Sequence, residues 1–85
     1  AVDAAKAVKW YKKAAEQGYH WSQCDLAYCY QNGIGIKINY QLASYWWKLA
    51  AEQGNSRAQH SLGYCYHHGL GVEQDGREAF KWYMK

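Results

Sequence analysis

The chain has 85 residues, 18% of them aromatic, no proline and a formal net charge of +3. This length allows one domain, and the modest charge does not by itself indicate binding to nucleic acid or to an anionic membrane surface. No apolar run approaches the ~20 residues that a membrane-spanning helix needs, so we expect no membrane partner.

The first predicted helix follows Asp3, whose short carboxylate is suited to accept a hydrogen bond from an orphan backbone N–H. Its apolar residues recur at helical spacing, which places them on one inward face. These residues are Ala7, Trp10, Tyr11 and Ala14. Gly18 ends the helix, since glycine adopts the left-handed conformation of a helix terminus without strain.

A second helix is predicted over residues 20–32, followed by a glycine-containing turn over 33–39, in which Ile36 is expected to plug the helix pair. Asn39 is expected to cap a third helix. The inward face of the third helix is predicted to hold Ala43, Trp46, Trp47, Ala50 and Ala51, with Trp46 at its centre. The small alanines would let helices approach closely while the tryptophans fill the remaining volume.

The remainder of the chain repeats this plan. A fourth helix is predicted over residues 56–68, a second glycine turn over 69–75, and a fifth helix after Asp75. No stretch shows the alternation typical of a strand. The sequence therefore predicts an all-α fold, an α/α superhelix or solenoid of antiparallel helix pairs with about five helices.

A fixed internal period underlies this arrangement. The residues Ala-Ala-Glu-Gln-Gly at 14–18 recur 36 residues later at 50–54. A period of this size is typical of a solenoid built from one supersecondary unit. We divide the chain into the second helix of a partial repeat (1–18), a full repeat (19–54) and a repeat truncated at its C-terminal end (55–85).

The repeated residues spell A-x-x-x-L-[AG]-x-x-Y-x-x-G-x-G-[VI]-x-x-[DN]-x-x-x-A-x-x-W-[WY]-x-x-A-A-E-Q-G. In the later copy they are Ala58, Leu62, Gly63, Tyr66, Gly69, Gly71, Val72, Asp75, Ala79, Trp82 and Tyr83. This pattern resembles the Sel-1-like repeat family, a relative of the tetratricopeptide repeats. The resemblance implies a scaffold or adaptor that binds a partner protein or peptide, with the first helix of each repeat lining a concave groove.

Helical-wheel positions give the candidate groove residues. They are Trp21, Cys24, Tyr28, Gln31, Arg57, His60, Tyr64 and His67. Tyr, Trp and Arg are favoured in binding hot spots because each adds contact area and a polar handle. The alternative interpretation is that Trp21 and Tyr28 pack against the next helix.

The three cysteines are Cys24, Cys29 and Cys65. An odd count is poor support for a disulfide framework, so we expect free thiols and favour the cytoplasm as the compartment. Some secreted members of the Sel-1-like repeat family join the two helices of a repeat by a disulfide bond. The resemblance places those bridges at Ala15 with Ser22 and at Ala51 with Ala58, where this chain has no cysteine.

Other chemistries are weakly indicated. Gly33-x-Gly35 lacks the third glycine and preceding strand of a dinucleotide site. His60 and His67 lie about 10 Å apart along a helix, too far for one zinc ion. Cys24 with His60 has no third group to orient the histidine. We therefore expect no cofactor, no metal and no enzyme.

Two alternative functions stay open. Cysteine-rich members of the resembling family have been linked to β-lactam hydrolysis, which the missing paired cysteines argue against. Weak nucleic-acid binding would use a basic outer face. Its lysines are Lys9, Lys12, Lys13, Lys48, Lys81 and Lys85.

The ends of the chain lead to an expectation about assembly. The repeat pattern begins within a unit and stops before a further Ala-Ala-Glu-Gln-Gly, so we expect an excerpt of a longer array. Apolar residues near both ends would then lack a covering repeat, and self-association through these uncapped ends is expected. These residues are Val2, Trp10, Tyr11, Trp82, Tyr83 and Met84.

Overall fold

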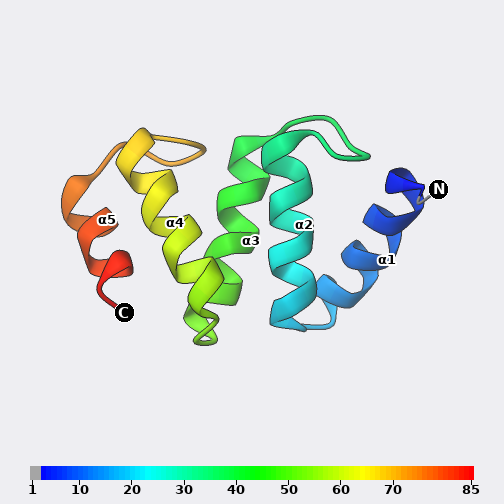
Figure 1. The fold of residues 1–85 in the computed structure, drawn as a ribbon, viewed down its shortest axis with the longest axis horizontal. Helices are drawn as coiled ribbons and strands as arrows, with labels where there is room; N and C mark the ends of the chain where they lie inside the picture. Colours follow the sequence, from blue (N-terminus) through cyan, green and yellow to red (C-terminus); the bar gives the residue numbers. More distant parts are fainter. Residues whose placement is uncertain (1–2) are drawn as a thin grey trace.

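The computed structural model describes residues 3–85, and all regular structure in that range is helical. The helices are α1 (Ala4–Glu16), α2 (His20–Asn32), α3 (Tyr40–Glu52), α4 (Ser56–His68) and α5 (Gly76–Tyr83). Each packs against the next in a row about 40 Å long (Figure 1). The predicted α/α solenoid of five helices is therefore confirmed.

Most helices begin at a short polar side chain that satisfies an otherwise free backbone donor. The Asp3 carboxylate accepts from Ala5 N at 3.0 Å, and Asn39 Oδ1 accepts from Leu42 N at 3.0 Å. Asn55 and Asp75 cap α4 and α5 in the same way. The helix starts predicted at Asp3, Asn39 and Asp75 are confirmed.

Each of the two long turns contacts the start of an earlier helix. The turn between α2 and α3 contacts α1, and the turn between α4 and α5 contacts α3. Gly71 has a positive φ of 72°, and a Cβ atom at this position would overlap the carbonyl oxygen of Tyr40 at the start of α3. Gly35 makes the equivalent approach to Ala4 at the start of α1. Only glycine allows both this conformation and this backbone contact. The turns therefore set the spacing between successive repeats.

The core is a continuous strip of small and aromatic side chains between neighbouring helices. Its members are Val8, Ala15, Cys24, Leu26, Ala27, Cys29, Tyr30, Ala43, Trp47, Ala50, Ala51, Ala58, Leu62 and Cys65. Ile36 packs against this strip as expected. The alanines keep helix axes close, and the strip links all units in one core.

Trp47 is buried as predicted, whereas Trp46 and Trp10 differ from their predicted positions. Trp47 is 1% exposed and forms the centre of α3, whereas Trp46 is only partly buried and lies edge-on to Tyr45. One residue is a 100° turn of the helix, so the inward face is centred closer to Trp47 than the sequence pattern indicated. Trp10 is 69% exposed, because α1 buries Val8 and Ala15 against α2 instead.

Apolar side chains remain open at both ends of the row. Trp10 on α1, with Phe80 and Met84 at the end of α5, are among the most exposed large apolar residues. Val2, which the sequence interpretation placed with them, lies outside the described residues. Self-association through these surfaces stays a prediction.

Candidate functional site

The candidate groove residues lie on α2 and α4, and we call the exposed surface of these two helices the α2–α4 face. Trp21 is 68% exposed, and Tyr28 and Tyr64 are both more than two-fifths exposed. His60 and His67 are exposed, and Gln31 is partly buried. Seven of the eight predicted side chains therefore reach the surface, and the core alternative for Trp21 and Tyr28 is not what the structure shows.

Cys24 is the exception, since its side chain is fully buried. Its prediction as a groove residue is wrong. The α2 helix contacts α1 and α3 on both flanks, and this turns a position that looked outward on the wheel into part of the core. Burial raises the pKa of the Cys24 thiol to about 11, and the nearby Arg57 charge only partly opposes this effect.

Arg57 on the α2–α4 face lies close to side chains of two other helices. Its guanidinium carbon lies 5.3 Å from the centre of the Tyr28 ring and 5.6 Å from that of Trp47. Arg57 Nη1 lies 3.6 Å from Asp25 Oδ1, which is an ion pair longer than a hydrogen bond. Two aromatic rings and one carboxylate from α2 and α3 thus surround a cation from α4.

Trp47 of this cluster is also hydrogen-bonded to Gln31 on α2. The Trp47 indole N–H donates to Gln31 Oε1 at 2.9 Å, so the buried ring has its one polar atom satisfied. Gln31 is thereby tied to α3. Sequence reasoning missed Asp25 and Trp47 as parts of this cluster. The helical spacing of Asp25, one turn before Tyr28, was the available signal.

A cleft adjoins this cluster between α1 and α2. It has a volume of about 240 Å³ and is mostly apolar. Its lining residues are Ala4, Ala7, Tyr11, Asp25, Tyr28, Cys29 and Ile34. The residue equivalent to Tyr11 one repeat later is the larger Trp47, which is buried between α3 and its neighbours.

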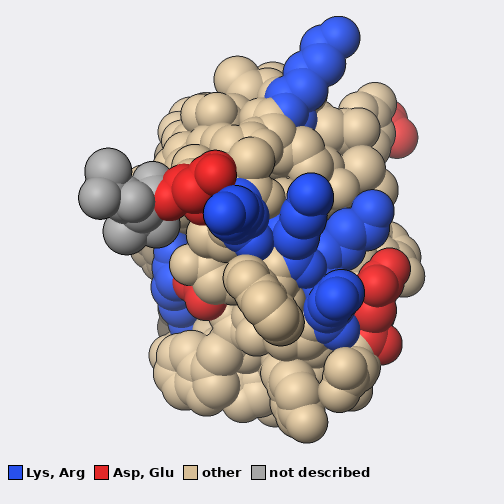
Figure 2. All heavy atoms as spheres, turned by 90° about the vertical axis from the view of Figure 1, so that its right-hand side faces the viewer, with Lys and Arg blue, Asp and Glu red and all other residues tan. Residues whose placement is uncertain are grey.

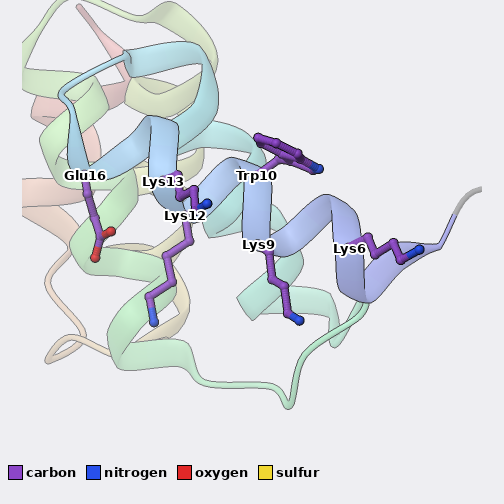
Figure 3. A pocket seen from close by; sticks show the side chains of 6 residues that line it. All are labelled: Lys6, Lys9, Trp10, Lys12, Lys13 and Glu16. Atoms are coloured by element: carbon purple, nitrogen blue, oxygen red, sulfur yellow. The ribbon is translucent and has the colours of Figure 1, made fainter.

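Basic side chains gather at the α1 end of the molecule (Figure 2). A hollow of about 460 Å³ there is lined by Lys6, Lys9, Trp10, Lys12, Lys13 and Glu16. All six belong to α1, and Lys9 and Lys12 point away from the Trp10 ring (Figure 3). Lys13 Nζ lies 5.4 Å from the centre of that ring. This is a solvated surface whose walls are flexible side chains.

The lysines expected on a basic outer face are spread along the molecule. Lys9, Lys12 and Lys13 lie on α1, Lys48 lies on α3, and Lys81 lies on α5 at the far end (Figure 1). Only the α1 lysines form a dense group, which Lys6 joins. Weak nucleic-acid binding stays a prediction.

Cys24 and His60, the pair considered for catalysis, differ in their exposure to solvent. Cys24 is buried with a raised thiol pKa, while the exposed His60 ring packs against Tyr83 with 5.2 Å between ring centres. Across residues 3–85, no three His, Cys, Asp or Glu side chains are grouped as a metal site would require. In the same range, every helix is too short or too polar to cross a bilayer.

The buried thiols give a first prediction. Cys24, Cys29 and Cys65 are free and buried, so a thiol reagent should react with all three in urea but only very slowly in the native protein. Burial holds the pKa of Cys24 and Cys65 near 11, above the ordinary 9.0. These thiols ionise at a lower pH in the unfolded chain than in the folded one. The free energy of unfolding is therefore highest below pH 9 and falls as the pH rises through 11.

The measurement is a timed thiol titration with and without urea, together with urea unfolding between pH 8 and 11. A thiol that reacts equally fast in both states would contradict burial. A free energy of unfolding that stays level from pH 9 to 11 would contradict the raised pKa values.

The helix pairs, their buried alanine strip and the repeated glycine turns define an α/α repeat protein. The Sel1 repeat family model matches residues 1–19, 22–55 and 56–85, which is nearly the whole chain. The chain belongs to the Sel1 repeat family. Sel1 repeats generally serve as protein–protein interaction modules.

The solved structures that are similar to this chain include two SLR or Sel1 repeat proteins. One is c5321, a protective antigen present in uropathogenic Escherichia coli strains, which has an SLR fold. Its sequence is 43% identical and its structure superposes with a TM-score of 0.95. The match covers 96% of this chain and 18% of c5321. The other is a Sel1 repeat protein from Oxalobacter formigenes, with 38% identity, 94% coverage of this chain, 23% of its own and a TM-score of 0.92. No curated protein matches the chain. The chain thus spans about a fifth of the length of either relative.

Proposed function

We propose that this chain is a scaffold or adaptor module, and that the α2–α4 face is a concave groove that holds an extended segment of a partner protein. The proposed contact residues are Trp21, Tyr28, Gln31, Arg57, His60, Tyr64 and His67. Cys24 is not among them, since it is buried. The partner is a protein or peptide, and no cofactor takes part.

One observation carries this proposal. Trp21, Tyr28 and Tyr64 are large aromatic residues that stay exposed on α2 and α4, the first helices of two successive repeats. Aromatic and arginine side chains supply most of the energy at protein interfaces because they bury a large area with little loss of rotamer freedom. The Sel1 repeat family, whose members generally bind proteins, supports the same reading.

The test is a site-directed cross-link. A photoreactive phenylalanine in place of Tyr64 should capture the partner, whereas the same group in place of Tyr45, an exposed residue of α3, should not. With the partner identified and purified, Tyr28→Ala and Tyr64→Ala should each weaken binding by at least about ten-fold, as expected for hot-spot residues.

Tyr45→Ala is the matched control and should change the dissociation constant by less than about two-fold. Capture of the partner from position 45 and not from 64 would place the interface on the other side of the molecule and refute the proposal.

A further inference from the structure

We infer that the segment held on the α2–α4 face is acidic, with a carboxylate that binds Arg57 and a neighbouring apolar side chain that enters the cleft between α1 and α2. This inference rests on the proposed function and adds the chemistry of the partner. It depends on the unused donors of Arg57 and the position of the cleft.

The donors of Arg57 are available. A guanidinium carries five N–H donors in one plane, yet none of residues 3–85 accepts a hydrogen bond from it, and its closest carboxylate oxygen, on Asp25, lies at 3.6 Å. The ring centres of Tyr28 and Trp47 lie 5.3 Å and 5.6 Å from its central carbon, and 48% of the side chain is exposed. Its edge therefore remains free to form the paired hydrogen bonds that arginine makes with a carboxylate.

The charges on this face are few. Arg57 is the one Lys or Arg residue of α2 and α4, and Asp25 is the one Asp or Glu residue. A carboxylate of the partner would therefore share the guanidinium with Asp25, whose oxygen lies 3.6 Å from Arg57 Nη1.

The cleft supplies a second point of contact. Tyr28 belongs both to the cleft lining and to the Arg57 cluster, so the two places share one ring. A volume of about 240 Å³ is ample for a branched or aromatic side chain, since an apolar cavity of ~150 Å³ accepts benzene. In an extended segment, residues two apart point to the same side about 6–7 Å from each other. An acidic residue two positions from an apolar one matches this layout.

The experiment is a ¹⁵N–¹H NMR titration of the whole chain with three short peptides. They carry Glu-Ser-Leu-Ser-Glu, the neutral Gln-Ser-Leu-Ser-Gln, or Glu-Ser-Ala-Ser-Glu, each flanked by Gly and Ser. The first should shift amide signals of α2 and α4 in a saturable way. The other two should bind at least about five-fold more weakly, because each lacks one of the two contacts.

Variants then locate the contacts. Arg57→Gln should weaken the acidic peptide at least about five-fold, and Arg57→Lys should weaken it less, since it keeps the charge but loses the planar fork. Arg77→Gln removes the same charge on α5 and should change affinity by less than about two-fold. Tyr11→Trp introduces the residue found at the equivalent position of α3 and should reduce the advantage of Leu over Ala. Thermal unfolding by circular dichroism confirms that each variant is folded.

Three results would overturn the inference. They are the absence of saturable shifts at about 5 mM peptide, an equal effect of Arg57→Gln and Arg77→Gln, and shifts confined to the lysines of α1. The outcome is separable from that of the proposed function. A partner that depends on Tyr28 and Tyr64 but binds Arg57→Gln normally would leave the scaffold function intact and remove only the acidic recognition.

Discussion

Trp47→Ala is expected to lower the free energy of unfolding by roughly 3–5 kcal/mol, as truncation of a large buried aromatic residue does. Trp47 is 1% exposed, lies between α2 and α4, and has its indole N–H bonded to Gln31. Ala43 and Ala50, which lie on the same face of α3, are too small to refill the space. Since a domain of this kind has about 5–15 kcal/mol of stability in total, much of the chain's margin would be lost.

Urea unfolding followed by circular dichroism at 222 nm measures this loss. Trp46→Ala is the matched control, since Trp46 is the adjacent tryptophan on the same helix and is only partly buried. It should cost less than half as much. A larger effect at Trp46 would mean that the inward face of α3 is centred where the sequence pattern first placed it.

Gly71→Ala is expected to be the second most damaging single change, at roughly 3 kcal/mol or more. The new methyl group would overlap the backbone carbonyl of Tyr40, and a φ of 72° already disfavours any L side chain. The helix start of α3 would have to move away from the turn. We therefore expect the α3–α4 spacing to loosen, with less helical signal as well as lower stability.

Gly54→Ala separates the two causes. Gly54 also has a positive φ, of 92°, but a Cβ atom there would meet no neighbour within 4 Å. It should cost only the conformational term, about 1–2 kcal/mol. Equal losses at Gly54 and Gly71, measured by the same urea titrations, would show that the turn is not held by close backbone contact.

The helices themselves were predictable from the sequence because their signals are local. Asp3, Asn39 and Asp75 begin helices through bonds to backbone donors two or three residues away. The apolar spacing and the 36-residue period then give antiparallel pairs that must stack, since one repeat cannot bury its face alone. The same period indicated membership of the Sel1 repeat family.

The candidate site was only partly predictable. Exposure of Trp21, Tyr28 and Tyr64 follows from the helical wheel, because it depends on one helix at a time. The burial of Cys24 depends on which neighbours flank α2, and the sequence pattern does not encode this. The same limit explains why Trp46 was favoured over Trp47, since both lie near the inward face and only the packing of α3 between α2 and α4 distinguishes them.

The sequence by itself thus determined the repeat, the helix boundaries and the family, all of which depend on bonds and spacings within about one repeat. Tertiary structure decided which side chains share a site. One cluster contains residues of three helices that lie up to 32 positions apart in the chain, namely Asp25, Trp47 and Arg57. The reason is geometric: the crossing of helices sets contacts to within a few ångströms, whereas periodicity specifies only a direction around each helix.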